Sequence, residues 1–177
     1  MKKILAFGAS SSRNSINKKL ATWAAGQQST ASVTLIDLND FEMPIFSIDK
    51  EQENGIPEAA QKFKALVDSH DGILVSLAEH NGAYSAAFKN IFDWISRMEG
   101  KAWSDKPMFL LATSPGGRGG SSVLEMAVNR FPFNGGKVAA SFSLPSFGNN
   151  FSEGKGIVDE GLKSMFQGQL HLFLEEI

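Results

Sequence analysis

The hydrophobic residues of the chain gather in five short runs that predict the strands of a buried sheet. Each run is nearly continuous in apolar residues and ends at glycine, serine or other turn-forming residues, which is typical of parallel strands covered on both faces. The five predicted strands are Lys3–Phe7, Val33–Leu38, Gly72–Ala78, Met108–Thr113 and Val138–Leu144. Strands of this kind need helices on either side of the sheet.

Amphipathic segments between these runs predict the helices. Ile16, Leu20, Trp23 and Ala24 recur at helical spacing after the first strand, and the serines within residues 12–15 can cap the first turn. Four further apolar stripes at helical spacing lie within residues 63–67, 87–95, 123–128 and 158–177. Turn-forming residues predict a long loop over residues 39–57.

The alternation of strand and helix predicts one doubly wound α/β domain over residues 1–177. Right-handed crossovers place helices on both faces of a five-stranded parallel sheet. A length of 177 residues is typical of one domain, and no repeat, linker or low-complexity tract divides the chain. Ligands of such sheets bind beyond the carboxyl ends of the strands, so the loops after the first, third and fourth strands carry the candidate chemistry.

Composition and charge argue against several classes of function. Hydrophobic residues make up 42% of the chain and charged residues 20%, as in ordinary folded domains. The 17 Lys and Arg residues against 19 Asp and Glu residues give a net charge of -2, which offers no basic field for nucleic acid. The chain has no cysteine, which excludes disulfides, thiolate nucleophiles, iron–sulfur clusters and cysteine-containing zinc sites.

The sequence also bears on location and on metal binding. No apolar run approaches the roughly 18 residues that span a bilayer, and the run after Lys2 and Lys3 is too short for the core of a secretory signal. We therefore expect a cytoplasmic protein without a membrane partner. Three scattered histidines without HxxxH or HxH spacing predict no metal site. His70 and His171 are predicted to lie on helices and to be structural.

The first of the three loops, residues 8–17, has the composition of an anion site. It reads Gly-Ala-Ser-Ser-Ser-Arg-Asn-Ser-Ile-Asn and leads into a helix. Amides at a helix amino terminus carry partial positive charge, serine hydroxyls add donors, and Arg13 can pair with phosphate oxygens. The loop lacks the Walker pattern and the three-glycine dinucleotide fingerprint, which disfavours nucleoside triphosphates and a classical NAD site. By residue type alone, its serines and asparagines serve equally well as helix caps.

Three further segments make the pattern specific. Residues 78–85 read Ala-Glu-His-Asn-Gly-Ala-Tyr-Ser and precede the helical segment Lys-Asn-Ile-Phe-Asp-Trp at residues 89–94, and residues 114–120 read Ser-Pro-Gly-Gly-Arg-Gly-Gly. In this order, each after its strand, these segments resemble the NADPH-dependent FMN reductase family over nearly the full chain. The resemblance implies a flavodoxin-like fold, bound FMN, and electrons passed from NADPH or NADH through the flavin to an acceptor.

The resemblance also implies roles for residues of all three loops. The first loop would hold the FMN phosphate with Ser10, Ser12, Arg13, Ser15, Ile16 and Asn17. The isoalloxazine edge would be followed, largely through backbone groups, by Glu79, His80 and Asn81. The other side of the ring would be approached by Ser114, Pro115, Gly116 and Gly117, where glycine lets the backbone come close to a flat ligand. Apart from the resemblance, Arg118 is either a group that attracts the NADPH phosphates or a solvated surface arginine. Phe147 and Trp103 are candidates to wall the open face of the flavin, from the same subunit or a neighbouring one.

Two departures from the family pattern limit what can be carried over. The spacing from Arg13 to the next serine is one residue shorter than in many relatives, and residues 78–81 read Ala-Glu-His-Asn where many relatives have Pro-Glu-Tyr-Asn. Because Glu79 and Asn81 remain, the ring-contacting conformation is expected to persist, whereas the acceptor preference cannot be inherited. His80 is either a polar group near the substrate face or an exposed loop histidine, and we favour the second interpretation.

Three other interpretations are disfavoured. Asp37 ends the second strand and could imitate the acidic residue of an NAD ribose site, but without the glycine fingerprint we interpret it as a strand-end cap. No Gly-x-Ser-x-Gly pentapeptide occurs, which disfavours a hydrolase. Trp94 and the apolar stripe beside it are interpreted as core or subunit contact, not as a flavin-stacking surface.

The favoured function is an NAD(P)H-dependent oxidoreductase that passes electrons through FMN to a quinone, an azo compound, a metal oxyanion or free flavin. The flavin itself accepts hydride, so the protein needs no acid, base or nucleophile. The alternative is a flavodoxin-type electron carrier, but carriers usually present a strong acidic field and the net charge here is only -2. A flavin- or nucleotide-sensing module is a third alternative.

Relatives in the family form dimers or pairs of dimers, so we expect a homodimer or homotetramer. The sequence does not select among the acceptors or between NADPH and NADH.

Overall fold

Five parallel strands form the central sheet in the order β2-β1-β3-β6-β7, in a computed structural model that describes residues 1–177. The strands are β1 (Lys2–Ala9), β2 (Ala31–Ile36), β3 (Gly72–Leu77), β6 (Lys106–Thr113) and β7 (Gly136–Leu144). All five predicted strands are confirmed, with small shifts at their ends. Their order is that of the flavodoxin-like doubly wound sheet.

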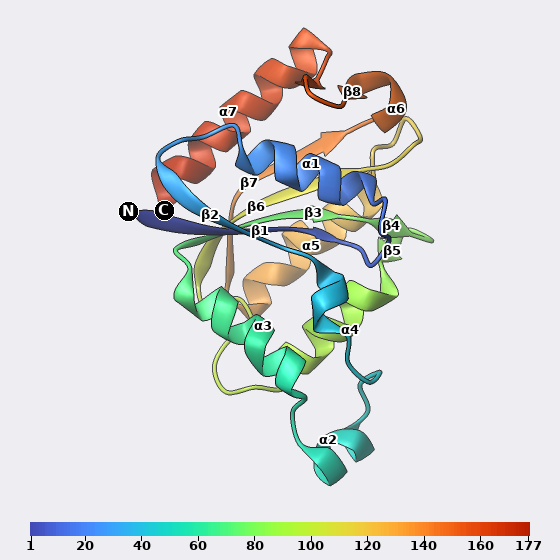
Figure 1. The fold of residues 1–177 in the computed structure, drawn as a ribbon, viewed down its shortest axis with the longest axis vertical. Coiled ribbons are helices and arrows are strands. Elements are labelled where there is room, and N and C mark those ends of the chain that lie inside the picture. Colours follow the sequence, from blue (N-terminus) through green and yellow to red (C-terminus); the bar gives the residue numbers. More distant parts are fainter.

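Helices cover both faces of the sheet, as expected (Figure 1). On one face lie α1 (Ile16–Ala25) and α7 (Glu160–Glu176); on the other lie α3 (Glu58–Ser69), α4 (Ala86–Ile95) and α5 (Ser121–Arg130). Alternate side chains of a strand point to opposite faces. In β1, Leu5 and Phe7 therefore join the core beneath α3, α4 and α5, whereas Ile4 and Ala6 join the core beneath α1 and α7. None of the helices has the length and apolar content needed to cross a bilayer.

Aromatic rings fill the core beneath α3, α4 and α5. The ring of Phe88 on α4 lies 6.3 Å from that of Phe7 and 6.2 Å from that of Trp103. Trp103 is fully buried, and its indole lies 4.8 Å from the ring of Phe131, which begins the short helix η2 (Phe131–Asn134). The expectation that Trp103 walls the open face of a flavin is therefore wrong, because this side chain belongs to the core.

The segment predicted as a plain loop over residues 39–57 contains two short helices. They are η1 (Leu38–Phe41) and α2 (Ile48–Asn54). Helix α2 buries no side chain and lies away from the sheet (Figure 1). A short helix without a buried face leaves no periodic apolar signal in the sequence, so pattern alone does not detect it.

The connection from β7 to α7 also contains short elements of regular secondary structure. Helix α6 (Phe147–Asn150) is followed by a two-stranded hairpin of β8 (Phe151–Ser152) and β9 (Gly156–Ile157). Val158 is exposed and precedes α7, so the last predicted helix begins later than its apolar stripe suggests.

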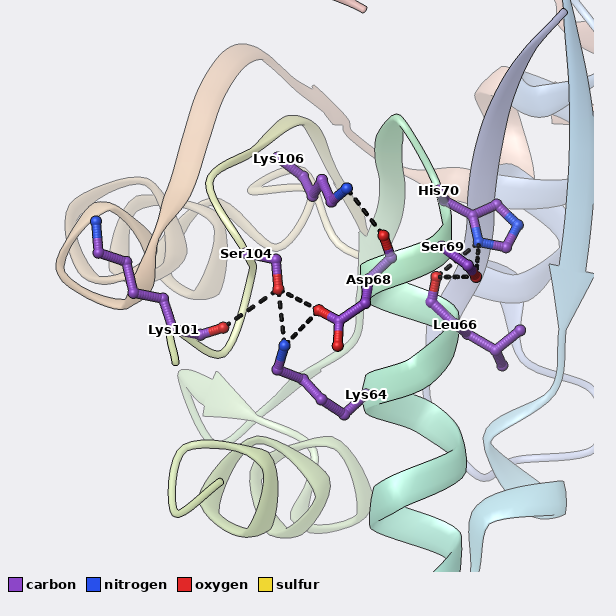
Figure 2. Close-up of polar contacts among 8 residues, drawn as sticks. All are labelled: Lys64, Leu66, Asp68, Ser69, His70, Lys101, Ser104 and Lys106. Atoms are coloured by element: carbon purple, nitrogen blue, oxygen red, sulfur yellow. Dashed lines mark hydrogen bonds and ion pairs between the residues drawn. The ribbon is translucent and has the colours of Figure 1, made fainter. Parts of the chain in front are cut away.

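His70 lies just after α3 and not on a helix (Figure 2). Its ring is buried, with Nδ1 2.6 Å from the carbonyl oxygen of Leu66 and Nε2 2.8 Å from Oγ1 of Thr34. His70 thus joins the end of α3 to the edge strand β2, far along the strands from the candidate loops. His171 lies on α7 as predicted and pairs with Glu175.

Next to His70, the end of α3 holds a buried cation (Figure 2). The Lys64 side chain is only 7% exposed, forms an ion pair with Asp68, and lies 2.7 Å from Oγ of Ser104. Burial raises the pKa of Asp68, but the hydrogen bonds from Lys64 and Ser104 outweigh it and hold that pKa below its ordinary value. The cluster fastens α3 to the segment before β6.

This cluster predicts a loss of stability in acid. Because the pKa of Asp68 is lower in the folded chain than in the unfolded one, its ion pair stabilises the fold above about pH 4, and this contribution is lost as the pH falls through the folded-state pKa. Asp68→Asn should lower the free energy of unfolding measured with urea near neutral pH, and the difference from wild type should shrink in acid. Glu125→Gln, an exposed control on α5, should change that free energy by less than about 0.5 kcal/mol. An Asp68→Asn effect independent of pH would contradict the assignment.

Gly8 predicts a second stability effect, because α1 passes directly over it. A Cβ at Gly8 would lie 2.9 Å from the carbonyl carbon of Asn17 and closer still to the backbone of Lys18. Gly8→Ala should therefore push α1 outward and lower the free energy of unfolding by about 1–3 kcal/mol. Gly168→Ala, in the exposed middle of α7 where a Cβ meets no atom within 4 Å, should raise it by about 0.5–1 kcal/mol. Urea unfolding of both variants checks the prediction. Equal changes in the free energy of unfolding for Gly8→Ala and Gly168→Ala would refute it.

Candidate functional site

The ends of β1, β3 and β6 bring the three candidate loops around one pocket of about 310 Å³. The first loop and the start of α1 contribute Ser10, Ser12, Asn14, Ser15, Ile16 and Asn17. The second loop contributes Ala78, Glu79 and His80, and the end of β6 with the third loop contributes Thr113, Ser114 and Pro115. Segments far apart in the sequence are thus adjacent, and most of the predicted cofactor residues line one pocket.

The remaining predicted residues lie beside the pocket. Arg13 is exposed and lines a neighbouring pocket on the outer side of α1. Asn81 is exposed at the tip of the second loop. Arg118 is exposed, and its guanidinium donates to Oγ of Ser122 at 2.8 Å. Phe147 is 9% exposed, and its ring stacks on Phe151 at 4.7 Å, which leaves little ring surface for a substrate.

The first loop keeps backbone amides available for a ligand. The hydroxyl of Ser15 caps α1 by accepting from the amide of Lys18 at 3.2 Å. Five amides of this loop and of the first helical turn donate to no group of the protein, namely those of Ser11, Arg13, Asn14, Ile16 and Asn17. Amides at a helix amino terminus carry partial positive charge and bind phosphate readily. The loop therefore fits a phosphate through its backbone.

The side chain of Asn17 fastens α1 to the sheet. Its Oδ1 accepts from Oγ of Ser76 at 2.7 Å and from the amide of Thr113 at 3.0 Å, and its Nδ2 donates to the carbonyl of Thr113 at 3.1 Å. Asn17 is only 3% exposed. Its side chain is thus committed to β3 and β6, and only its backbone amide remains for a ligand.

The second loop is a β-hairpin of β4 (Glu79–His80) and β5 (Ala83–Tyr84). Asn81 and Gly82 form the turn with φ of 53° and 76°, the left-handed conformation that a type I′ turn requires. The loop predicted here is thus a short hairpin, for which the Asn-Gly pair is the usual signal. His80 on β4 is exposed and also lines the pocket, so both interpretations of this histidine remain open.

Two side chains of this segment tie it to the other loops. The carboxylate of Glu79 accepts from the amide of Val123 at 3.1 Å and so caps α5, which begins after Gly120 and has no side-chain cap of its own. The hydroxyl of Ser85 donates to the carbonyl of Ala9 at 2.8 Å, at the end of β1. The hairpin is therefore held in a fixed position between the first and third loops.

The third loop contains two kinds of glycine. A Cβ at Gly117 would meet no atom within 4 Å, and one at Gly116 would meet only Oγ of Ser114 at 4.0 Å. The folded chain itself gives no reason for glycine at these two positions, whereas a flat ligand approaching the backbone does. Gly119 and Gly120, in contrast, have φ of 59° and 75° and are needed for the turn into α5.

The loop after β7 supports the third loop from behind. The amide of Ser146 donates to the carbonyl of Gly116 at 2.9 Å, and the amide of Phe147 donates to the carbonyl of Ser114 at 3.0 Å. Phe147 thus acts in the structure through its backbone, as a support of the pocket wall.

Asp37 lies at the end of β2 and caps η1 by accepting from the amide of Asn39 at 3.0 Å, which confirms its interpretation as a strand-end cap. It also forms an ion pair with Lys18 of α1. The hydrogen bond from Lys18, followed by that from the Asn39 amide, holds the pKa of Asp37 below its ordinary value. The pair fixes the outer side of α1 to the edge of the sheet.

The segment at residues 89–94 has a structural use outside the pocket. The side chain of Asn90 accepts from the amide of Phe46 at 2.8 Å and donates to the carbonyl of Pro44 at 3.1 Å. The indole of Trp94 donates to the same carbonyl at 2.7 Å and is 1% exposed. Trp94 is therefore core, as interpreted, and the segment anchors the connection between η1 and α2.

Comparison with known proteins decides the family. Residues 2–148, which include all three loops, match the family model described as NADPH-dependent FMN reductase. The chain belongs to the NADPH-dependent FMN reductase family. Its predicted class, an NAD(P)H-dependent oxidoreductase of this family, is confirmed, as are the predicted fold and the flavoprotein resemblance.

Relatives of this FMN reductase family member include two curated bacterial enzymes. A quinone reductase of Escherichia coli (strain K12) is 26% identical over 147 residues, which cover 77% of this chain and 74% of that protein. An NADPH azoreductase of Bacillus sp. (strain OY1-2) is 37% identical over 90 residues, which cover 51% of this chain and 48% of that protein. The chain thus aligns with about half the length of the azoreductase.

Solved structures share the fold of the FMN reductase chain. FerB, a flavoenzyme NAD(P)H:(acceptor) oxidoreductase from Paracoccus denitrificans, has a TM-score of 0.79 at 22% identity and covers 99% of this chain and 97% of its own. An oxidised flavodoxin from Bacillus cereus has a TM-score of 0.58 at 16% identity over 100% of this chain and 99% of its own. The fold is therefore flavodoxin-like.

The position of Asn17 predicts that it matters for both stability and ligand binding. Asn17→Ala leaves the amide and carbonyl of Thr113 buried without partners, which should lower the free energy of unfolding by about 1–3 kcal/mol. FMN affinity, measured by quenching of flavin fluorescence, should fall as well because the first and third loops lose their common anchor. Asn14→Ala, in the same loop but without a side-chain bond, should change the free energy of unfolding by less than about 0.5 kcal/mol. Equal stability of the two variants would refute this role.

Proposed function

We propose that this chain binds FMN in the three-loop pocket and uses it to pass electrons from NADPH or NADH to a small acceptor, a quinone or an azo compound. The observation that carries the proposal is the set of five unpaired backbone amides at the start of α1, which adjoins a pocket between the loops after β1, β3 and β6. The names of the quinone and azo reductase relatives support the choice of acceptors.

The residues present fit FMN at both ends of the molecule. The amides within residues 11–17, with the hydroxyls of Ser10 and Ser12, would hold the phosphate. The isoalloxazine would lie between the hairpin at residues 79–84 and the backbone at residues 114–117, where open glycines allow close approach. The pocket volume of about 310 Å³ falls at the lower end of the range for small-molecule sites, about 300–1,000 Å³.

When bound, FMN supplies the redox chemistry, accepting hydride from the reduced nicotinamide and returning electrons to the acceptor. The task of this chain is then to bind FMN and to orient it toward the electron donor and the acceptor. Backbone amides of the first and third loops stabilise negative charge without reorganising, because β1, β6 and the Asn17 hydrogen bonds hold them rigidly. The one carboxylate that lines the pocket, that of Glu79, is used to cap α5.

The proposal extends to assembly. Phe133 is 80% exposed and Met126 is 39% exposed, both at the outer side of α5 and η2. A homodimer or homotetramer would cover these side chains, and the family resemblance supports such an assembly.

One backbone amide tests the phosphate site directly. Ile16 is the first residue of α1, where proline is compatible with a helix because the amide has no intrahelical acceptor. Ile16→Pro should therefore keep the fold but weaken FMN binding about tenfold or more, as expected for loss of one hydrogen bond to a charged phosphate. Ile16→Ala removes the same side chain but keeps the amide, and should retain the wild-type FMN affinity.

The experiment has two readouts. Titration of purified protein with FMN, followed by fluorescence quenching, gives the affinities, and oxidation of NADPH at 340 nm with 1,4-benzoquinone as acceptor gives turnover. Wild-type protein that neither binds FMN nor oxidises NADPH or NADH would refute the proposed function. Equal FMN affinity of Ile16→Pro and Ile16→Ala would refute the phosphate site.

A further inference from the structure

His80 is the one histidine of the chain whose ring nitrogens have no partner in the protein. Both ring nitrogens of His70 are hydrogen-bonded, and His171 pairs with Glu175. His80 is exposed and lines the three-loop pocket, which is the proposed cofactor pocket. Its imidazole is therefore available to a molecule bound there.

The β4–β5 hairpin fixes the place of this imidazole. Successive side chains of a strand point to opposite sides, and the carboxylate of Glu79 points to the start of α5, where it accepts from the amide of Val123 at 3.1 Å. His80, the next residue of β4, therefore projects away from α5. Because the hydroxyl of Ser85 bonds to the end of β1, the hairpin is held beside the first loop.

The pocket and the elements around it offer few other groups that exchange a proton. Glu79 and His80 are the titratable residues of the lining, and Glu79 is used to cap α5. On β5, burial raises the pKa of Tyr84 to about 12, and its hydroxyl oxygen is buried. The flanking loops add Arg13 and Arg118, which are exposed, lie outside the lining and keep their charge. Histidine is the side chain that gains and loses a proton near neutral pH.

On the proposed function, the acceptor half of the reaction consumes a proton. A quinone that receives a hydride gains two electrons and one proton, and the hydroquinone anion that results needs one more proton to leave as the neutral product. An azo compound likewise needs one proton besides the hydride to become a hydrazine. The hydride comes through the cofactor, whereas the further proton comes from water or from a side chain placed at the acceptor.

We propose that His80 donates this proton, which makes it a catalytic residue for the reduction of the acceptor. A ring N–H of the protonated imidazole donates to the carbonyl oxygen of the quinone. As the hydride is transferred, the N–H bond breaks and an O–H bond forms, and the neutral imidazole then takes a proton from water, to which it is exposed.

The inference rests on the proposed function and deepens it, because it takes the first of the two interpretations of His80. Many relatives have tyrosine at this position, which is a much weaker acid than histidine. The proton donor is therefore a property of this chain and is not carried over from the resemblance.

Two acceptors separate proton donation from electron transfer. FMN-loaded protein, reduced with stoichiometric NADPH, is mixed in a stopped-flow instrument with 1,4-benzoquinone, whose reduction needs a proton, or with ferricyanide, which takes single electrons and no proton. His80→Gln should slow reoxidation by the quinone about a hundredfold, the lower end of the range for general acid catalysis, and leave reoxidation by ferricyanide unchanged. The matched control is His171→Gln, at an exposed histidine of α7, which should change neither rate.

The pH dependence of the same rates gives a second readout. In the wild type, reoxidation by the quinone should slow as the pH rises through the range in which histidine loses its proton, because the neutral imidazole is too weak an acid. His80→Gln should lack this dependence, and so should the ferricyanide reaction. An equal loss with both acceptors, or no loss with the quinone, would overturn the proposal.

Proton NMR checks the position of His80 without turnover. The chain has three histidines, and the imidazole signals of His80 are those that disappear in His80→Gln. Addition of FMN should shift these signals and leave those of His171 in place. If FMN binds, as measured by fluorescence quenching, and the His80 signals do not move, the proposal is wrong and the proposed function stands. Wild-type protein without FMN affinity refutes the proposed function instead.

Discussion

The buried side-chain amide of Asn17 holds the start of α1 against the sheet where three strands end. One residue accepts from Ser76 on β3 and both accepts from and donates to Thr113 on β6. Gly8 makes this contact possible, because any side chain there would collide with the helix backbone. The first loop is consequently drawn tight over the carboxyl edge of the sheet, with its amides pointing to no acceptor of the protein. The pocket depends on this anchor.

The candidate site is made mainly of backbone, and side chains serve to position it. Glu79 caps α5, Ser85 bonds to the end of β1, and the amides of residues 146 and 147 support the third loop. This arrangement agrees with flavin chemistry, in which the cofactor brings the reactive atoms and the protein contributes orientation and fixed dipoles. Such a site needs the backbone of its three loops to be held in place, and each of these hydrogen bonds contributes to that.

The segments that resemble the family most strongly have different physical uses. The serine-rich loop leaves amides free for a ligand, whereas Asn90 and Trp94 lie outside the pocket and anchor the chain near Pro44. Arg13, which the resemblance assigns to the FMN phosphate, lines the neighbouring pocket on the outer side of α1 and not the cofactor pocket. Its role at the phosphate stays a prediction.

The sequence alone determined the five strands, the main helices, the doubly wound architecture and the three loops that share the pocket, because buried strands and amphipathic helices leave strong local patterns. It did not reveal α2, which buries nothing, or the true place of Trp103, whose burial depends on distant rings. Tertiary structure alone decided that Asn17 and Glu79 act as anchors, that Phe147 is a backbone support, and that Arg13, Trp23 and Phe151 line a second pocket. Such contacts join residues separated by up to about a hundred positions, and their geometry is set by how the helices pack on the sheet, which no local pattern encodes.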